Sequence, residues 1–272
     1  WAGRLRTQHC SILDALSGQP LDVFLQTIPI EVTSKAVDGM ATAPKDPSSL
    51  FDWMHSLHEQ RCRGDAVVTP ACILLTAGPA AGKTSMLSQM VMHLLEGGSE
   101  LVPILIKVQL LQRRLLETPD AFAVAWNWVD AYLHLEHEAA PYHMLRQALM
   151  ARRAIILLDG LDEGGKARDE IERHVIEVLA PQGHVMLVTS RPAGVDEGRF
   201  ASFHRLSLAP LSEAQQEEAL ARRLGAERTA ELLPYLCDKV PKDEAGERVT
   251  SNPLMLSMVA SVFEFRQGLE MP

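Results

Sequence analysis

The stretch AIILLDGLDEGG, residues 154–165, decides the fold expected of this chain. Its first five residues are apolar and run directly into Asp159, which is followed by Asp162 and Glu163. A short apolar run between charged segments is typical of a buried strand in a parallel sheet. Because ligands of open α/β sheets bind at the carboxyl ends of the strands, we expect Asp159 to lie at the edge of a binding site.

A second stretch, ILLTAGPAAGKTS at residues 73–85, predicts that this site takes a phosphate. It fits the spacing G-x-x-x-x-G-K-[ST] of a phosphate loop, except that its first glycine is replaced by Ala77. In such a loop, backbone N–H groups converge on phosphate oxygens, and a helix expected over residues 83–95 adds its positive N-terminus. The predicted phosphate-binding residues are Gly78, Pro79, Ala80, Ala81, Gly82, Lys83, Thr84 and Ser85.

The two stretches together predict a nucleotide site that uses Mg²⁺. Thr84 and Asp159 are the expected metal ligands, with Asp159 acting through water. Either Asp162 or Glu163 would orient or deprotonate an attacking water molecule, and the sequence leaves both open. Seen without the phosphate loop, the acidic segment would also fit an exposed loop that caps a core strand.

A third apolar run, residues 184–192, ends in the polar sequence TSRP. If this run is a strand of the same parallel sheet, its carboxyl end lies beside the phosphate loop. The cation at that end, Arg191, would then read the terminal phosphate. The plainer interpretation is an arginine on the surface at the end of a strand.

These motifs together resemble the NACHT family of STAND NTPases, within the P-loop ATPases related to AAA+ proteins. The matching segments are IILLDGLDE at 155–163, TSRP at 189–192, LAPLS at 208–212 and SNPLML at 251–256. The resemblance covers residues from about 50 to the C-terminus. It implies ATP or ADP with Mg²⁺, and it implies that Pro253 contacts the adenine base. Ala77 and Ala80 depart from the family, which usually has glycine there.

The order of the predicted elements indicates an α/β fold with three segments. We expect an N-terminal extension at 1–47, a P-loop nucleotide-binding domain at 48–210 and a small helical domain at 211–272. Strands that alternate with helices predict a three-layer αβα sandwich with a parallel sheet. Strands are expected at 73–76, 102–110, 154–158, 184–192 and 204–208, and helices at 49–61, 83–95, 119–135, 141–151, 166–179, 213–224, 227–238 and 253–267.

The N-terminal segment is the least informative part of the sequence. Residues 11–25 are consistent with a short helix that is interrupted at Gly18 to Pro20, and residues 27–32 look like an incoming strand. Residues 38–49, with a glycine and two prolines, are typical of a linker.

Bulk composition narrows the function classes. The 272 residues are 47% hydrophobic and carry a net charge of −9, which argues against direct binding to nucleic acid or to anionic membranes. Four widely spaced cysteines favour a reducing compartment, so we expect a cytoplasmic location. No apolar run reaches membrane-spanning length. Because the chain starts at Trp1, we expect a fragment of a longer polypeptide.

The leading functional hypothesis is a conformational switch controlled by ATP and ADP within a larger signalling protein. It would hydrolyse ATP slowly and would self-associate through the parent protein. Two alternatives stay open: an AAA+ motor ATPase, for which Arg168 or Arg173 would have to act on a neighbouring subunit, and a nucleotide-binding scaffold without hydrolysis. A small-molecule kinase would need an acceptor-binding lid, and the pairing of DGLDE with TSRP argues against it.

Overall fold

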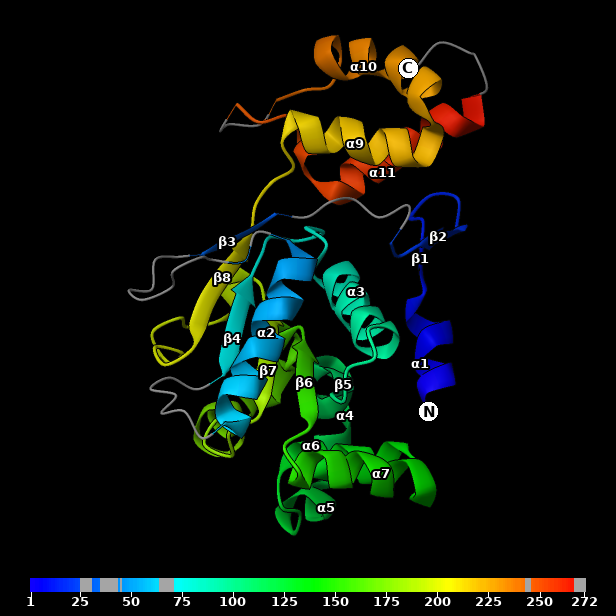
Figure 1. The fold of residues 1–272 in the computed structure, drawn as a ribbon. Helices are drawn as coiled ribbons and strands as arrows, with labels where there is room; N and C mark the ends of the chain where they lie inside the picture. The colour runs from blue at the N-terminus through cyan, green and yellow to red at the C-terminus, as the bar shows by residue number, and fades with distance from the viewer. Residues whose placement is uncertain (25–30, 35–43, 45, 64–70, 243–245, 267–272) are drawn as a thin grey trace.

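A six-stranded sheet forms the centre of the protein (Figure 1). The computed structural model describes residues 1–24, 31–34, 44, 46–63, 71–242 and 246–266. The strand order is β3-β8-β4-β7-β6-β5, and all neighbours are parallel except β3, which runs antiparallel to β8. The strands are β3 (Val32–Ser34), β4 (Cys72–Thr76), β5 (Val102–Lys107), β6 (Ala154–Asp159), β7 (Val185–Ser190) and β8 (His204–Leu208).

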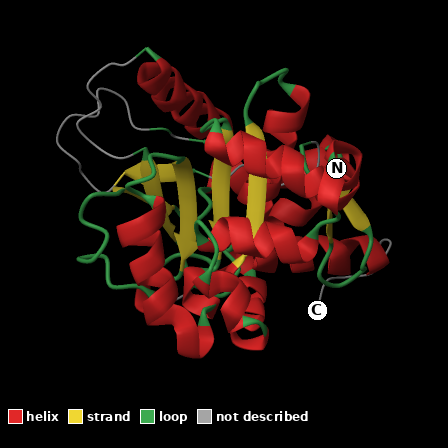
Figure 2. Cartoon of the chain, turned by 90° about the horizontal axis from the view of Figure 1, so that it is seen from below, coloured by secondary structure: helices red, strands yellow, loops and turns green. Residues whose placement is uncertain are grey.

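Helices cover both faces of this sheet, as Figure 2 shows from below. Alternate residues of β4 belong to different cores: Ile73 packs in the cluster that includes residues of α2 and α3, and Leu74 in the cluster of α4 to α8. The predicted three-layer αβα sandwich is therefore confirmed. The covering helices are α2 (Pro47–Cys62), α3 (Lys83–Glu96), α4 (Val108–Glu117), α5 (Pro119–Ala123), α6 (Trp128–Glu136), α7 (Ala139–Met150) and α8 (Arg168–His174).

The strand order decides where the polar ends of the strands meet. β7 lies between β4 and β6 and is parallel to both. Thr76 at the end of β4 is level with Ser190 at the end of β7. Leu158, the residue before Asp159, is level with Val188 of β7. The carboxyl ends of the three strands therefore share one edge of the sheet, and the phosphate loop, the acidic segment and the TSRP segment start from it.

Three helices beyond the sheet form a separate group, which we call the helical unit: α9 (Glu213–Leu224), α10 (Ala226–Asp238) and α11 (Pro253–Arg266). Their buried residues form a core of their own, which includes Leu220, Leu232 and Leu256. Figure 1 shows this unit above the carboxyl edge of the sheet. Among the described residues, no helix combines the length and the apolar character needed to cross a membrane.

The start of α9 follows the predicted capping pattern. The Ser212 side chain accepts a hydrogen bond from the backbone N–H of Gln215, and the Gln215 side chain accepts one from the N–H of Ser212. We expect Ser212→Ala to lower the free energy of unfolding by about 1 kcal/mol. Chemical denaturation measures the loss. Glu217→Ala, at an exposed position of the same helix, is the control; an equal loss there would contradict a specific capping role.

The N-terminal segment differs from the predicted interrupted helix. It forms the short helix α1 (Ala2–His9) and then a two-stranded antiparallel hairpin of β1 (Ser11–Leu13) and β2 (Pro20–Asp22). The Asp14 carboxylate accepts hydrogen bonds from the backbone N–H groups of Leu16 and Ser17, which fixes a turn where a helix was expected. Of the strand predicted at 27–32, Val32 lies in β3, and residues 27–30 are outside the described residues.

Three other predicted boundaries were wrong. The strand expected to reach residue 110 ends at Lys107, and α4 begins at Val108. The helix predicted over 119–135 is split into α5 and α6, because the Asn127 side chain caps a new start by accepting a hydrogen bond from the N–H of Asp130. The helix predicted over 166–179 changes into a π-helical turn after His174. The short helical turns are η1 (Leu161–Glu163), η2 (Gly165–Ala167), η3 (Val175–Leu179), η4 (Pro192–Gly194) and η5 (Val249–Ser251).

Candidate functional site

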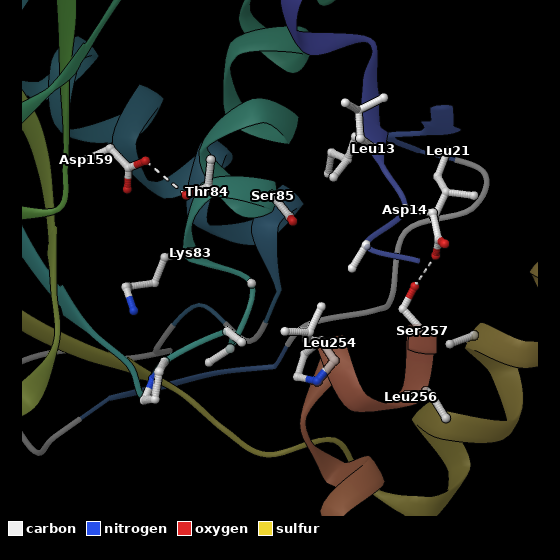
Figure 3. Close-up of a pocket in the computed structure, with 18 of the residues that line it drawn as sticks. Leu13, Asp14, Leu21, Lys83, Thr84, Ser85, Asp159, Leu254, Leu256 and Ser257 are labelled. Carbon is white, nitrogen blue, oxygen red and sulfur yellow. Dashed lines mark hydrogen bonds between the residues drawn. The ribbon is translucent and has the colours of Figure 1, made fainter. Parts of the chain in front are cut away.

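A cavity of about 400 Å³ lies at the carboxyl edge of the sheet, between the phosphate loop, the helical unit and the N-terminal hairpin. Figure 3 shows part of its lining. All the predicted site residues line it except Gly78: Pro79, Ala80, Ala81, Gly82, Lys83, Thr84, Ser85, Asp159, Asp162, Glu163, Arg191 and Pro253. One cavity therefore brings together the three sequence motifs and the start of α11.

The loop between β4 and α3 is organised by its own lysine. The ammonium group of Lys83 donates hydrogen bonds to the carbonyl oxygens of Ala77 and Gly78, each at 2.9 Å. Gly78 therefore contacts Lys83 through its carbonyl oxygen, although it does not line the cavity. Burial lowers the pKa of Lys83, Asp162 raises it, and Arg191 lowers it further. The loop thus curves around the ammonium group of Lys83, and α3 begins at the same residue.

Ala80 adopts the left-handed backbone region, with φ of 57°. A residue with a Cβ atom is strained there, and glycine is not. Alanine at this position therefore costs stability in the folded loop relative to glycine.

We expect Ala80→Gly to raise the free energy of unfolding by about 0.5–1 kcal/mol. Glycine relieves strain in the folded loop, and this stabilisation exceeds the amount by which glycine's greater chain entropy stabilises the unfolded protein. The denaturation midpoint measures the gain. Ala81→Gly is the matched control, since the φ of Ala81 lies outside the left-handed region. A gain from Ala81→Gly as large as that from Ala80→Gly would contradict the strain argument.

The end of β6 contacts the loop through one carboxylate. The Thr84 hydroxyl donates to Oδ2 of Asp159 at 3.0 Å, and the Thr189 hydroxyl of β7 donates to Oδ1 at 2.8 Å. Thr189 also accepts a hydrogen bond from the N–H of Gly160 at 2.9 Å. Both carboxylate oxygens are thereby oriented, one of them toward the start of α3. Thr84 and Asp159 are close enough to serve as neighbouring ligands of one cation.

Asp162 is engaged by the end of β7. Its carboxylate forms an ion pair with Nε of Arg191 at 3.1 Å and accepts a hydrogen bond from the Arg191 backbone N–H, also at 3.1 Å. A Cβ atom on Gly194 would lie 2.2 Å from the Cβ of Asp162, so only glycine permits this approach. Asp162 therefore holds Arg191 in position.

Glu163 is placed differently. Its side chain is exposed to the cavity, and no ion pair is found for it within the part of the chain that the structure describes. It lies over Gly160, whose φ is 79° and where an added Cβ would be 3.0 Å from the Glu163 carboxyl carbon. Both acids line the cavity, but they are distinct: Asp162 is paired with Arg191, and Glu163 forms no ion pair among the described residues.

The helical unit contacts the phosphate loop directly. Asn252 donates from its side-chain amide to the carbonyl oxygen of Pro79 at 3.1 Å. Its side-chain oxygen accepts from the N–H of Leu254 at 2.9 Å, which fixes the first turn of α11. Pro253 follows Asn252 at the start of α11 and lines the cavity.

Several residues of this site escaped the sequence analysis. Thr189 was noted only as the end of a strand, Asn252 only as part of a motif, and Asp14 and Arg223 were not singled out. Asp14 and Arg223 line the cavity from opposite ends of the chain and form an ion pair of 2.9 Å. No local sequence pattern predicts an ion pair between residues so far apart in the chain.

The sequence matches no protein-family model, and no curated protein is found to be similar to it. Solved structures do match. A chain in the structure of the E. coli MS115-1 HORMA:CdnC:Trip13 complex is 14% identical, with 82% of each chain covered and a TM-score of 0.53. C. elegans PCH-2 is 14% identical over 82% of this chain and 58% of that one, with a TM-score of 0.44. At this level of identity the likeness concerns the fold alone, and the chain has the fold of the AAA+ and P-loop ATPases.

Proposed function

We propose that this chain is an ATP-binding module of NACHT type, which acts as a conformational switch in a larger signalling protein and hydrolyses ATP slowly. The observation that carries the proposal is the 3.0 Å contact between Thr84 and Asp159. It joins the phosphate loop to the acidic strand end within one cavity.

The groups around this contact suit a nucleoside triphosphate with Mg²⁺. Thr84 and Asp159 would hold the ion, which takes oxygen ligands and retains water. The bound ion would neutralise charge on the terminal phosphates. Lys83 and Arg191 both line this cavity and supply positive charge to it. The N–H groups at the start of α3 add the helix N-terminus.

The switch role is supported by the position of the cavity, which is lined by two parts of the protein with separate hydrophobic cores. Asn252 and Pro253 of the helical unit meet the phosphate loop, so a ligand there contacts both parts. Moving a switch from 1:99 to 99:1 requires about 5.5 kcal/mol of differential binding. A charged hydrogen bond contributes about 1.5–3 kcal/mol. If Lys83 and Arg191 each form such a bond with ATP and not with ADP, the two bonds together approach the required differential binding free energy.

Bound nucleotide and thermal stability test this function. The purified protein is denatured, and any released nucleotide is identified by chromatography. We expect ATP or ADP, and a melting temperature that rises when Mg²⁺ and ATP are added. A protein that releases no nucleotide and whose melting temperature ignores ATP, ADP and GTP would overturn the proposal. Hydrogen exchange in α9–α11 should differ between the ATP and ADP states; identical exchange would favour the non-hydrolysing scaffold.

One observation favours a second candidate, an AAA+ motor. The structure that resembles this chain with a TM-score of 0.53 belongs to a complex that contains Trip13. A motor of this kind would form a ring and would require an arginine from the neighbouring subunit. Arg173 is exposed at the end of α8 and could supply it, whereas Arg168 lies 3.5 Å from Glu172 of its own helix. Ring formation with ATP, together with loss of turnover in Arg173→Ala, would support the motor.

A further inference from the structure

The N-terminal segment bridges the two parts of the molecule that enclose the cavity. On one side it packs along α3: His9 Nδ1 lies 3.0 Å from the Ser88 hydroxyl, and the Gln89 side chain donates to the carbonyl oxygen of Val23 at 3.0 Å. Figure 1 shows α1 and the hairpin beside α3, with the hairpin directly below α11. The N-terminal segment thus contacts both α3 and α9, whose Arg223 lies 209 residues beyond Asp14 in the sequence.

On the other side, the hairpin is held by a buried carboxylate. Asp14, at the turn between β1 and β2, forms an ion pair with Arg223 of α9 at 2.9 Å. It also accepts hydrogen bonds from two hydroxyl groups of α11, Ser257 at 2.8 Å and Ser261 at 2.7 Å. Figure 3 shows the contact between Asp14 and Ser257. The hairpin is therefore joined to two helices of the helical unit at one point.

The ion pair is shielded from water. The side chains of Asp14 and Arg223 are 0% and 7% exposed, and Arg223 is also bound to Glu264 at 2.6 Å. Burial acts to raise the pKa of Asp14, but hydrogen bonds from Ser17, Ser261 and Ser257 hold that pKa well below its ordinary value. A charged carboxylate with this many donors stabilises one arrangement of the hairpin, and removing one partner leaves an uncompensated buried charge.

The hairpin side chains form an apolar wall of the cavity. Leu13 and Leu21 lie across the cavity from Lys83 and Asp159, and Leu254 of α11 also lines the cavity (Figure 3). The cavity is thus polar at the phosphate loop and apolar at the hairpin. A nucleotide with its phosphates at the loop would direct the flat faces of its base toward this wall.

We propose that Asp14 and Arg223 form a latch that holds the N-terminal hairpin and the helical unit together over the base of a bound nucleotide, and that this latch sets how long the nucleotide stays bound. The inference rests on the proposed nucleotide function. Asp14 and Arg223 are positioning residues, since their charges are satisfied by each other and by α11. With the latch closed, the base can leave only after the hairpin moves away from α9 and α11.

The test measures the dissociation rate of ADP carrying a fluorescent group on its ribose, displaced by excess ADP. We expect Arg223→Ala to raise this rate by at least about tenfold, because a buried ion pair broken on one side loses far more than an exposed one. Arg222→Ala is the matched control. Arg222 is the next residue on α9, and it pairs with Glu218 on the exposed face, so the rate should stay unchanged.

Three further measurements keep the result interpretable if Arg223→Ala destabilises the fold. Asp14→Ala and the double variant complete a double-mutant cycle with Arg223→Ala. If the two residues form one latch, ADP dissociates from the double variant no faster than from the faster of the two single variants. Arg223→Lys retains the charge and should restore part of the residence time. Hydrogen exchange of residues 11–22 without nucleotide should be faster in Arg223→Ala than in the unaltered protein.

The outcomes separate this inference from the proposed function. If the unaltered protein binds no nucleotide, the proposed function fails, and the exchange measurement alone reports on the latch. If the unaltered protein binds nucleotide and Arg223→Ala releases it at the same rate, the latch is overturned while the proposed function stands. Additive effects of the two single variants would also overturn it, because independent contributions are incompatible with one shared contact.

Discussion

Lys83→Ala is expected to weaken ATP binding by about 2–4 kcal/mol, which is roughly a 30- to 900-fold loss of affinity. The Lys83 ammonium group is held at the phosphate loop by the carbonyl oxygens of Ala77 and Gly78, and it lines the cavity. A phosphate group there would gain a charged hydrogen bond that water replaces poorly, because the lysine is already partly desolvated. Alanine removes this charge and leaves the backbone N–H groups of the loop.

Calorimetric titration with ATP and Mg²⁺ measures the loss. Lys166→Ala is the control, because Lys166 is an exposed lysine close to the acidic segment in η2 and is not among the residues that line the cavity. Its affinity should match that of the unaltered protein. A denaturation curve of Lys83→Ala checks that the loop variant remains folded. Unchanged affinity in a folded Lys83→Ala variant would remove the phosphate-loop assignment.

The sequence was informative where a local pattern determines structure. The run from Ala154 to Leu158 is continuously apolar because β6 is buried on both faces, and its end had to carry Asp159 to the edge of the sheet. The same reasoning located β4 and β7. The order of the strands was not predictable in this way. Strand neighbours are chosen by contacts between distant residues, and the position of β7 between β4 and β6 is what brings Thr189 to Asp159.

The N-terminal hairpin shows why the remainder could not be read from the sequence. Its strands are three residues long, too short for an alternating pattern to stand out. Asp14 is ordinary in its local context and becomes distinctive only beside Arg223, 209 residues away. Likewise, the spacing of Asp162 and Glu163 left their roles open. The backbone approach at Gly194 and the ion pair with Arg191 distinguish them.

Glu163→Gln is expected to lower the rate of ATP hydrolysis by about 100- to 10,000-fold while ATP binding is retained. Glutamine preserves the shape of the side chain over Gly160 but cannot accept a proton from water. Because Glu163 is directed to the cavity without a partner cation among the described residues, its loss should leave the ion pair between Asp162 and Arg191 intact. Phosphate release under saturating ATP measures turnover, and titration with ATP measures binding.

Asp162→Asn provides the comparison that assigns the two acids. Asp162 orients Arg191 through an ion pair and a backbone hydrogen bond, so its loss should weaken the discrimination between ATP and ADP as well as turnover. Glu170→Gln, an exposed residue of α8, should change neither quantity. If turnover survives in Glu163→Gln and disappears in Asp162→Asn with ATP affinity unchanged, the base is Asp162. In that case the ion pair with Arg191 would have to open before each turnover, and Arg191 would report the terminal phosphate by releasing the carboxylate that accepts a proton from the attacking water.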